Sequence, residues 1–317
     1  MAILKKVMKA PNEIFPFDHS VIRYPMYSSI KYDGFRCLNL CGDRLLSPAL
    51  KDIPNRQLPL HLNQFLQYCR LNRIVSDGEL WSPSIPFNEL SSIIRSFDKP
   101  LPDSVAYYIF DATSEMDWDS EHPQPFSNRL RFYMSLPNFP CIRKVIQVQV
   151  ADADSAAMHF DSIIDAGGEG TILRSPLSYY KHGRCTPNEN GMWKFKQFDT
   201  HDAKIIGVEE QMQMRHGIER TRNEIGELER EHSQSLYEPS GMVGAFIVNW
   251  GGQQFKVKPG KGFDFVAKRN LWTEHCTMNS IIGRCIEFKY MPHGTKDKPR
   301  IGSLVRFRPD KQGQDLA

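Results

Sequence analysis

Before residue 199, apolar and polar positions predict a mixture of short strands and short helices. Apolar residues recur at the three- and four-residue spacing of amphipathic helices in 57–70, 87–97, 127–136 and 154–166. Runs typical of strands occur at 73–81, 105–110, 144–150, 170–174 and 192–196. Since these segments do not follow a regular βαβ order, the pattern favours an α+β fold over a doubly wound sheet.

Three local predictions complete this part of the chain. Residues 1–27, rich in proline and aromatic residues, are expected to be an irregular lead-in, and 31–46 a hairpin. The helix at 154–166 is expected to begin at Asp154 or Ser155 and to stop at Gly167-Gly168, since these residue types are typical of helix caps.

After residue 199 the pattern changes to short, regular strands separated by Gly-rich turns, with one short helix near 263–271. The strands are expected at 203–208, 244–250, 253–258 and 283–290. About five strands in about 100 residues suit a small barrel of the oligonucleotide-binding (OB) type. We therefore expect two domains, 1–198 and 199–317.

The segment 211–240, inside the second domain, has no apolar pattern that would predict burial. It carries four arginines and six glutamates. From the charge pattern alone, this composition is typical of a solvated helix or a mobile loop.

Composition narrows the class of protein. A length of 317 residues suits about two domains, and 40% hydrophobic with 24% charged residues is typical of a soluble globular chain. The net charge of +3 is compatible with a nucleic-acid partner without indicating one. No apolar run is long enough for a bilayer, and the N-terminus lacks the apolar core of a signal peptide. Seven cysteines without Cys-x-x-Cys spacing argue against disulfides and structural zinc, so we expect a reduced, cytoplasmic protein.

The first candidate for chemistry is Lys31, in the stretch Lys31-Tyr32-Asp33-Gly34. A strand-like run ends at this lysine, and Asp-Gly is a turn signal. An amine at a rigid strand end can serve as a nucleophile if burial or nearby cations lower its pKa. The same four residues also suit a surface lysine before a hairpin turn.

Further groups of chemically useful residues follow along the chain. They are Asp77-Gly78-Glu79, Tyr108-Ile109-Phe110-Asp111, Glu169 to Arg174, Trp193-Lys194-Phe195-Lys196, and Arg300 with Arg306 to Lys311. Side chains alternate along a strand, so Lys194 and Lys196 are expected on one face. Each group has an ordinary structural explanation, and their order and spacing together are the informative feature.

In this order the groups resemble the signature motifs of the covalent nucleotidyltransferase superfamily, specifically the small viral and phage ATP-dependent DNA ligases. The resemblance covers residues 26–311. It implies an adenylation domain of antiparallel sheets and helices followed by an OB-fold barrel. It also implies nick sealing in three steps: a lysine takes AMP from ATP, AMP moves to the 5′-phosphate of the nick, and the 3′-hydroxyl displaces AMP. ATP and Mg²⁺ or Mn²⁺ would be the cofactors.

The resemblance also implies the partners and the setting of the reaction. Nicked double-stranded DNA would be the substrate, in DNA replication, repair or recombination. The protein would be a monomer with no membrane partner, in the cytoplasm, or in the host cytoplasm if the source is viral.

The resemblance assigns a role to each motif residue. Lys31 is the implied nucleophile. Lys194 and Lys196 would lower its pKa and stabilise the charge on the phosphoryl group in the transition state. Phosphoryl transfer depends on charge neutralisation, so a divalent metal is expected. Glu169 is assigned to the metal, and Glu79 to the ribose hydroxyls or the metal.

The remaining assignments concern the nucleotide and its leaving group. Phe110 would stack on adenine, and Arg36 would hold the ribose or the ends of the nick. Arg308, Asp310 and Lys311 match the family's Arg-x-Asp-Lys motif, which orients the pyrophosphate.

The chain departs from the family at two positions. Pro48 stands where the family has an arginine that contacts the 5′-phosphate of the nick, so Arg44 or Lys51 is expected to substitute. Ser29 stands where many relatives place a glutamate that reads adenine, which leaves adenine recognition to backbone groups.

The segment 211–240 acquires a function through the resemblance. In the viral relatives its position is filled by a hairpin that wraps the duplex, which implies a DNA clasp. Phosphate contacts would then come from Arg215, Arg220 and Arg222.

Three alternatives stay open. An mRNA capping guanylyltransferase shares Lys-x-Asp-Gly, an OB domain and Arg-x-Asp-Lys, although Glu169 stands where capping enzymes typically have Asp-Gly. An RNA ligase of the same superfamily is possible, although many lack this C-terminal domain. A non-catalytic OB protein that binds nucleic acid would not need the intact lysines. NAD-dependent ligases add zinc-finger and helical modules for which this chain offers no pattern, so ATP is the expected nucleotide.

Overall fold

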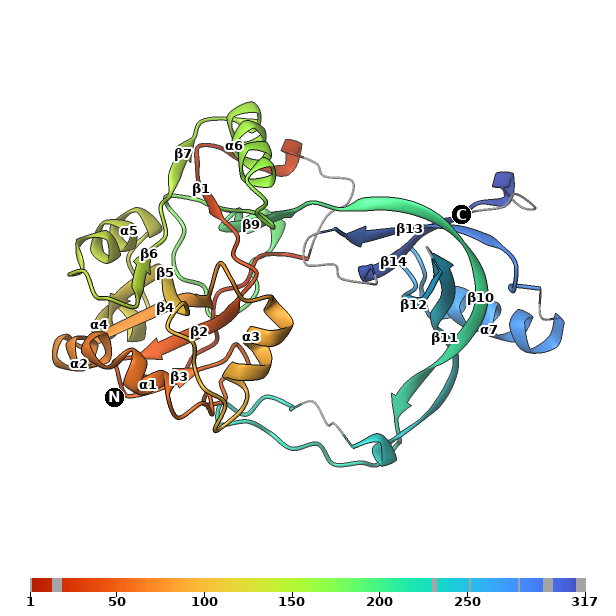
Figure 1. Cartoon of the computed structure of the whole chain (residues 1–317), viewed down its shortest axis with the longest axis horizontal. Coiled ribbons are helices and arrows are strands. Elements are labelled where there is room, and N and C mark those ends of the chain that lie inside the picture. Colours follow the sequence, from red (N-terminus) through yellow and green to blue (C-terminus); the bar gives the residue numbers. More distant parts are fainter. Residues whose placement is uncertain are drawn as a thin grey trace. The chain divides into compact units, whose positions relative to one another are not determined.

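The computed structural model describes residues 2–12, 19–229, 233–250, 252–278, 280–292 and 299–311 (Figure 1). The chain divides into two compact units, Met1–Lys196 and Gln197–Ala317. Among the helices in the described ranges, none is both long enough and apolar enough to cross a membrane.

The first unit is built on two sheets. One has the strand order β7-β1-β8-β9, formed by β1 Met26–Ile30, β7 Val148–Val150, β8 Gly170–Arg174 and β9 Met192–Lys196. The other has the order β3-β2-β4-β5-β6, formed by β2 Phe35–Leu40, β3 Arg44–Leu46, β4 Ile74–Trp81, β5 Ala106–Ser114 and β6 Ile142–Lys144. All of these strand pairs are antiparallel except β5–β6.

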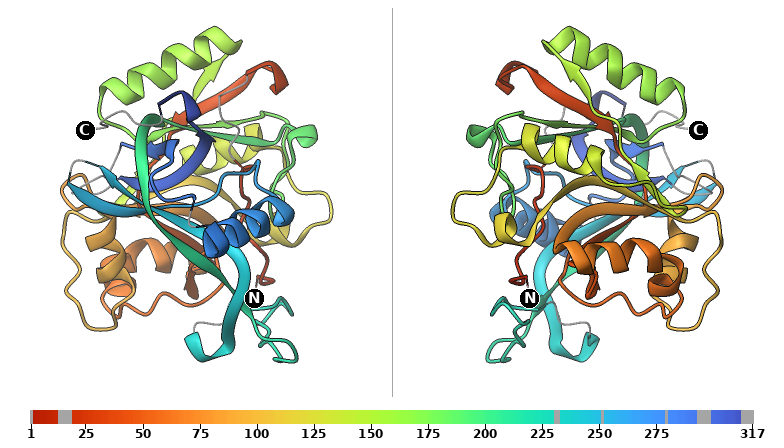
Figure 2. Two further views of the ribbon diagram at one scale, coloured as in Figure 1. Left: turned by 90° about the vertical axis from the view of Figure 1, so that its right-hand side faces the viewer. Right: turned by 90° about the vertical axis from the view of Figure 1, so that its left-hand side faces the viewer.

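Helices cover the sheets of this unit. They are α1 Leu58–His61, α2 Asn63–Asn72, α3 Phe87–Ile94, α4 Glu115–Asp119, α5 Phe126–Ser135 and α6 Ala153–Asp165, with 3₁₀ turns at His19–Val21 and Pro187–Glu189. The buried apolar faces of α2, α3 and α5 meet the second sheet, where Phe65, Leu90 and Tyr133 share one buried core with Tyr107. Helix α6, green at the top of both views in Figure 2, packs on β1, β7 and β8. The predicted α+β class is confirmed.

Local differences from the sequence pattern have physical causes. The run 144–150, expected to be one strand, holds only the last residue of β6 and all of β7, which lie in different sheets and are separated by 145–147. The N-cap of α6 is Asp152, not Asp154 or Ser155, since the Asp152 carboxylate accepts a hydrogen bond from the Ser155 N–H at 2.8 Å. Strand β5, expected at 105–110, continues to Ser114.

The second unit is a five-stranded sheet with the order β12-β11-β10-β13-β14. Its strands are β10 Asp199–Met214, β11 Tyr237–Trp250, β12 Gln253–Val257, β13 Cys285–Met291 and β14 Arg300–Phe307. The edge strands meet because the Lys258 N–H donates to the Gly302 carbonyl at 3.0 Å and the Leu304 N–H donates to the Lys258 carbonyl at 2.8 Å. This contact closes the sheet into the predicted OB-type barrel and pairs its exposed edges.

The barrel core holds side chains from all five strands, with Ile205, Phe246, Val257, Phe288 and Leu304 buried together. Helix α7 spans Phe265–Met278 and packs Leu271 and Trp272 against this core. The helix is longer than the sequence pattern predicted.

Strands β10 and β11 are also longer than predicted and form a hairpin arm (Figure 1). Their pairing continues to Met214 opposite Tyr237, and an isolated bridge joins Arg222 to Leu228 beyond it. In the described part of 211–240 the solvated-helix interpretation is therefore wrong. Residues 230–232 lie outside the described residues.

Candidate active site

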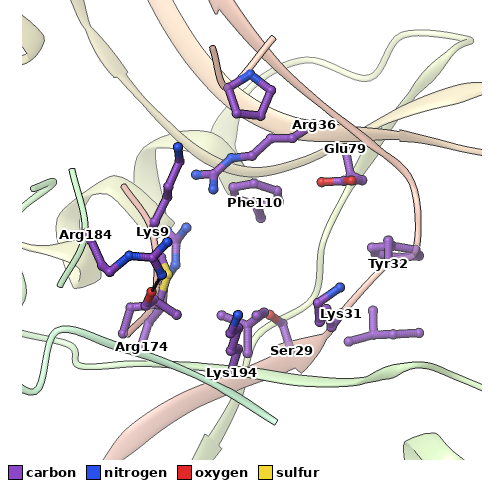
Figure 3. A pocket seen from close by; sticks show the side chains of 15 residues that line it. Lys9, Ser29, Lys31, Tyr32, Arg36, Glu79, Phe110, Arg174, Arg184 and Lys194 are labelled. Carbon is purple, nitrogen blue, oxygen red and sulfur yellow. Dashed lines mark hydrogen bonds between the residues drawn. The ribbon is translucent and has the colours of Figure 1, made fainter. Parts of the chain in front are cut away.

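Lys31 directly follows β1 and is held by the neighbouring strand. Its backbone N–H donates to the Gly170 carbonyl at 2.8 Å, and Ile30 pairs with Thr171 of β8. The side chain is 20% exposed and lines a pocket of about 340 Å³ in the first unit (Figure 3). Lys31 is therefore a pocket residue rather than a surface lysine before a turn.

Glu169 links Lys31 to Lys196 of β9. Its carboxylate is 1% exposed; one oxygen accepts a hydrogen bond from Lys31 Nζ, and the other accepts one from Lys196 Nζ at 2.9 Å. The register of β8 and β9, in which Gly170 pairs with Lys196, brings these groups together. A carboxylate this deeply buried needs such charged partners, so the arrangement locks all three side chains in one geometry.

Two glycines are required by this geometry. Gly170 has a φ of +147°, and a Cβ atom there would lie 2.0 Å from the Phe195 carbonyl oxygen. At Gly34 a Cβ atom would lie 2.4 Å from the Leu80 carbonyl oxygen and 2.7 Å from Glu79 Cγ. Any larger residue would push β8 away from β9, or the turn after Lys31 away from Glu79.

Glu79 faces the same pocket from β4. Burial raises the pKa of Glu79 to about 8, against the opposing influence of Lys31 and Arg36. A carboxyl group with this pKa is largely protonated at neutral pH and can donate a hydrogen bond, for example to a sugar hydroxyl. Its protonation state would follow the charge of any bound group.

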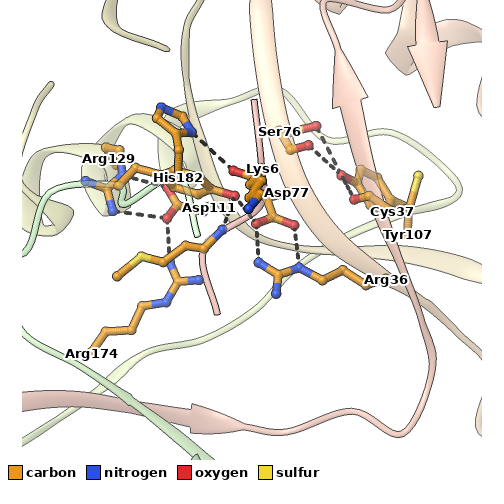
Figure 4. Close-up of polar contacts among 12 residues, drawn as sticks. Lys6, Arg36, Cys37, Ser76, Asp77, Tyr107, Asp111, Arg129, Arg174 and His182 are labelled. Atoms are coloured by element: carbon orange, nitrogen blue, oxygen red, sulfur yellow. Dashed lines mark hydrogen bonds and ion pairs between the residues drawn. The ribbon is translucent and has the colours of Figure 1, made fainter. Parts of the chain in front are cut away.

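Arg36 is fixed from behind by a buried carboxylate. Its guanidinium donates to both oxygens of Asp77, at 2.9 and 2.5 Å, and the Tyr180 hydroxyl donates to the same carboxylate at 2.5 Å (Figure 4). The guanidinium carbon lies 5.3 Å from the centre of the Phe110 ring, within cation–π distance. In the group Asp77-Gly78-Glu79, the aspartate therefore orients an arginine while the glutamate faces the pocket.

A second buried carboxylate, Asp111, fixes another arginine that lies near Phe110. Asp111 accepts two hydrogen bonds from Arg129, at 2.8 and 3.1 Å, and one from Arg174 at 2.5 Å (Figure 4). The Arg174 guanidinium carbon lies 5.2 Å from the Phe110 ring centre. Burial alone would raise the pKa of Asp111, but Arg129 and Arg174 outweigh it and lower the pKa.

The two buried aspartates form one charged layer. Asp77 and Asp111 are direct partners in the β4–β5 pairing, where like charges repel. Arg36, Arg129 and Arg174 provide three positive charges for these two negative ones, and two of the arginines, Arg36 and Arg174, line the pocket. The layer therefore turns an excess of positive charge toward the pocket.

Lys9 and Arg184 also line the pocket, and the sequence pattern assigned them no role. In Figure 3 they lie near Arg174, on the side opposite Lys31 and Glu79. Lys9 is held there because its N–H donates to the Gly183 carbonyl at 2.8 Å and its carbonyl accepts from the Cys185 N–H at 2.7 Å. Residues 1–27 offered no regular pattern that would single out Lys9.

The other expected site residues of the first unit divide into two groups. Lys194, Phe110 and Pro48 line the pocket. Arg44 and Lys51 are not among its described lining residues; Arg44 instead donates to both oxygens of Asp52, at 3.0 and 2.8 Å.

Glu79 is the acidic residue among the described residues that line the pocket, which limits the kind of metal that could bind there. Among the described residues no group of three or more His, Cys, Asp or Glu side chains could hold an ion. Mg²⁺ usually keeps several water ligands and binds one or two carboxylates together with substrate phosphates. Glu79, which lines the pocket, fits a metal of that kind, whereas Glu169 has its two oxygens bound to Lys31 and Lys196 and would have to exchange one of these lysines for the ion.

The expected residues of the second unit lie in two places. Arg308 and Lys311 both bind Asp202, and Arg308 also binds Asp310 at 2.8 Å. The arginines of the hairpin arm are exposed. There Arg220 donates to the Glu229 carbonyl at 2.8 Å and Arg222 donates to the Gly226 carbonyl at 2.5 Å, while Arg215 lies where β10 ends.

Comparison with known proteins supports this architecture. Residues 238–308 match the family model of the DNA ligase OB-like domain. No curated protein matches the chain. Among solved structures, Chlorella virus DNA ligase-adenylate is 21% identical with a TM-score of 0.52, and the likeness covers 96% of this chain and 99% of that one. A Lig E DNA ligase, described as a minimal scaffold for DNA binding, is also 21% identical, with a TM-score of 0.63 and coverage of 96% and 100%. The chain thus shares the fold of small DNA ligases over nearly its whole length.

Proposed function

We propose that this protein is an ATP-dependent DNA ligase that seals nicks in duplex DNA through a lysyl-AMP intermediate on Lys31. The observation that carries the proposal is the contact of Lys31 with Glu169 and, through it, with Lys196, beside a pocket whose lining also includes five other cationic side chains, Lys9, Arg36, Arg174, Arg184 and Lys194. An amine, a buried carboxylate and several cations around one cavity are the groups that transfer of an adenylate to lysine requires.

In the first step Lys31 Nζ attacks the α-phosphorus of ATP. The bond between this phosphorus and the bridging oxygen breaks, and pyrophosphate leaves. Lys31 must lose a proton before it attacks, and Glu169, its hydrogen-bond partner, is placed to receive that proton. Lys194 and Lys196, on one face of β9, offset the charge that develops on the phosphate oxygens.

The nucleoside would be held by the opposite sheet. Phe110 offers an aromatic ring to adenine, and the two guanidiniums beside it restrict its movement. Glu79 suits the ribose hydroxyls because its protonated carboxyl group can both donate and accept hydrogen bonds. A divalent ion bound by Glu169 or Glu79 with the phosphates would supply further charge neutralisation.

The second and third steps need a place for the 5′-phosphate of the nick. Lys9 and Arg184 line the pocket and have no part in holding the nucleoside. Arg44 is engaged by Asp52 instead, so we assign the replacement of the missing arginine at Pro48 to Lys9 and Arg184. The hairpin arm with Arg215, Arg220 and Arg222 would clasp the duplex through phosphate contacts.

The test is a gel assay of sealing on a nicked duplex, with ATP or GTP supplied and with all-DNA and DNA–RNA hybrid substrates in parallel. We expect sealing with ATP on the all-DNA nick and transfer of label from α-labelled ATP to the protein. If the protein took label from GTP alone, the proposal would be wrong and a capping guanylyltransferase would be indicated. Sealing confined to RNA-containing strands would replace it with an RNA ligase.

A further inference from the structure

Two cations near the end of the second unit converge on a single carboxylate. Lys311 Nζ lies 2.5 Å from Asp202 Oδ2, and Arg308 Nη1 lies 3.2 and 3.3 Å from the two Asp202 oxygens. Asp202 belongs to β10 and is more than 100 residues from both partners in the sequence. Only the barrel brings these groups together.

The backbone around these cations is anchored as well. The Arg308 N–H donates to the Cys285 carbonyl at 2.8 Å, and the Lys311 N–H donates to the Arg308 carbonyl at 3.1 Å. The Cys285 thiol contacts the Lys311 carbonyl at 3.1 Å. The short turn Pro309–Lys311 is therefore attached to β13 by its main chain and to β10 by its side chains.

The hydrogen bonds leave part of each cation facing outward. Arg308 uses Nε and Nη2 for Asp310 and Nη1 for Asp202. A guanidinium has five N–H groups and an ammonium has three, so each side chain retains donors beyond those used. Arg308 remains 16% exposed and Lys311 32% exposed.

Asp202 also sets the spacing of the two cations. Because Arg308 Nη1 and Lys311 Nζ both bond the same carboxylate oxygen, the two nitrogens are no more than about 6 Å apart. Two like charges this close repel one another unless an opposite charge lies between them. Without Asp202 the lysine, which is the more flexible of the two side chains, would move away.

We propose that Asp202 is a positioning residue for the first step of the reaction, holding Arg308 and Lys311 as a preset pair whose outward donors receive the pyrophosphate end of ATP. This inference rests on the proposed function together with the family resemblance, which assigns Arg308 and Lys311 to the pyrophosphate leaving group. Preset donors cost less entropy to engage than donors that must first be ordered, and misplacing them slows a phosphoryl transfer.

The test compares two half-reactions in Asp202→Asn. We expect the rate of lysyl-AMP formation at low ATP to fall on the order of 10- to 100-fold, with much of the loss recovered at high ATP because the apparent KM is raised. Sealing of a nick that already carries a 5′-adenylate involves no pyrophosphate and should proceed at the wild-type rate. Asp202→Glu, which keeps the charge and shifts its position, should give an intermediate loss.

The matched control is Glu209→Gln. Glu209 is also on β10 and forms an ion pair with Lys256 at 2.7 Å, but it does not contact the Arg308–Lys311 segment. We expect this variant to match the wild type in both half-reactions. Combining Asp202→Asn with Lys311→Met should cost less than the two single losses together, because Asp202 acts through Lys311.

Several results would overturn the inference. One is an unchanged rate of lysyl-AMP formation in Asp202→Asn, and another is a faster rate, which would mean that Asp202 competes with phosphate. A parallel loss in sealing of the adenylated nick would indicate general damage to the barrel. If thermal melting shows that Asp202→Asn is not folded, the same criteria are applied to Asp202→Glu instead. A wild-type protein that forms no lysyl-AMP would instead refute the proposed function itself.

Discussion

The two units of this protein hold their functional cations in different ways. In the first unit the carboxylates behind the pocket are buried: the Asp77 and Asp111 side chains are each 2% exposed and bind arginines from three other elements. In the second unit the Asp202 and Arg308 side chains are partly buried, at 13% and 16% exposed, whereas the Asp310 side chain at 60% and the Arg306 side chain at 64% lie at the surface. Broken buried pairs cost several kcal/mol, whereas surface pairs contribute little. The first unit therefore builds its pocket on fully buried pairs, whereas the second holds Arg308 and Lys311 on the partly buried Asp202, and only its outer pairs, such as Arg306 with Glu287, are cheap to exchange.

The largest effect is expected at the nucleophile itself. Lys31→Ala should abolish transfer of label from ATP to the protein, because Lys31 is the amine that the β1–β8 pairing places at the pocket. Stability should change little, since Glu169 keeps its contact with Lys196. Labelling with α-labelled ATP and thermal melting measure both; a Lys31→Ala protein that still accepts adenylate or seals nicks would refute the assignment.

The next effect tests the buried layer. Asp111→Asn removes the charge between Arg129 and Arg174 and leaves two guanidiniums poorly compensated in the interior. We expect the free energy of unfolding to fall by about 3–5 kcal/mol, as measured by chemical denaturation. A loss below about 1 kcal/mol would mean that the layer does not hold the first unit together.

A third experiment uses acid. An unfolded aspartate has a pKa of about 3.9. Because the pKa of Asp111 in the folded protein is lower, its contribution to stability is present above pH 4 and is lost as the pH falls through the folded value. The stability of the wild type should therefore decline more steeply below pH 4 than that of Asp111→Asn. Parallel declines in denaturation midpoints across that range would contradict the lowered pKa.

The smallest effect is expected at the surface of the barrel. Arg306→Gln breaks the contact with Glu287 at 2.6 Å, but the arginine is mostly exposed and its charge is screened by solvent. We expect a loss of less than about 1 kcal/mol by the same denaturation measurement. If Arg306→Gln lowered the free energy of unfolding as much as Asp111→Asn, the expected difference between buried and surface ion pairs would be wrong.

Local sequence patterns predicted the structural features that depend on residues close together in the chain. The alternation of Trp193 to Lys196 placed two lysines on one face of a strand, and β9 has Trp193 and Phe195 buried with the lysines between them. The α+β class and the barrel followed from the order of apolar runs and turns. The first residue of α6 could not be placed equally well from the sequence. Asp152 and Asp154 both suit an N-cap, and only the hydrogen bond to Ser155 distinguishes them.

The sequence by itself determined the order of the elements, the strand that ends at Lys31 and the residue types available for chemistry, since these depend on contacts within a few residues. Tertiary structure decided which side chains meet. Asp111 finds Arg129 and Arg174 at separations of 18 and 63 residues, and Arg308 finds Asp202 at 106. Such pairs depend on which strands become neighbours and in what register. The local pattern of apolar and polar positions does not specify either of these.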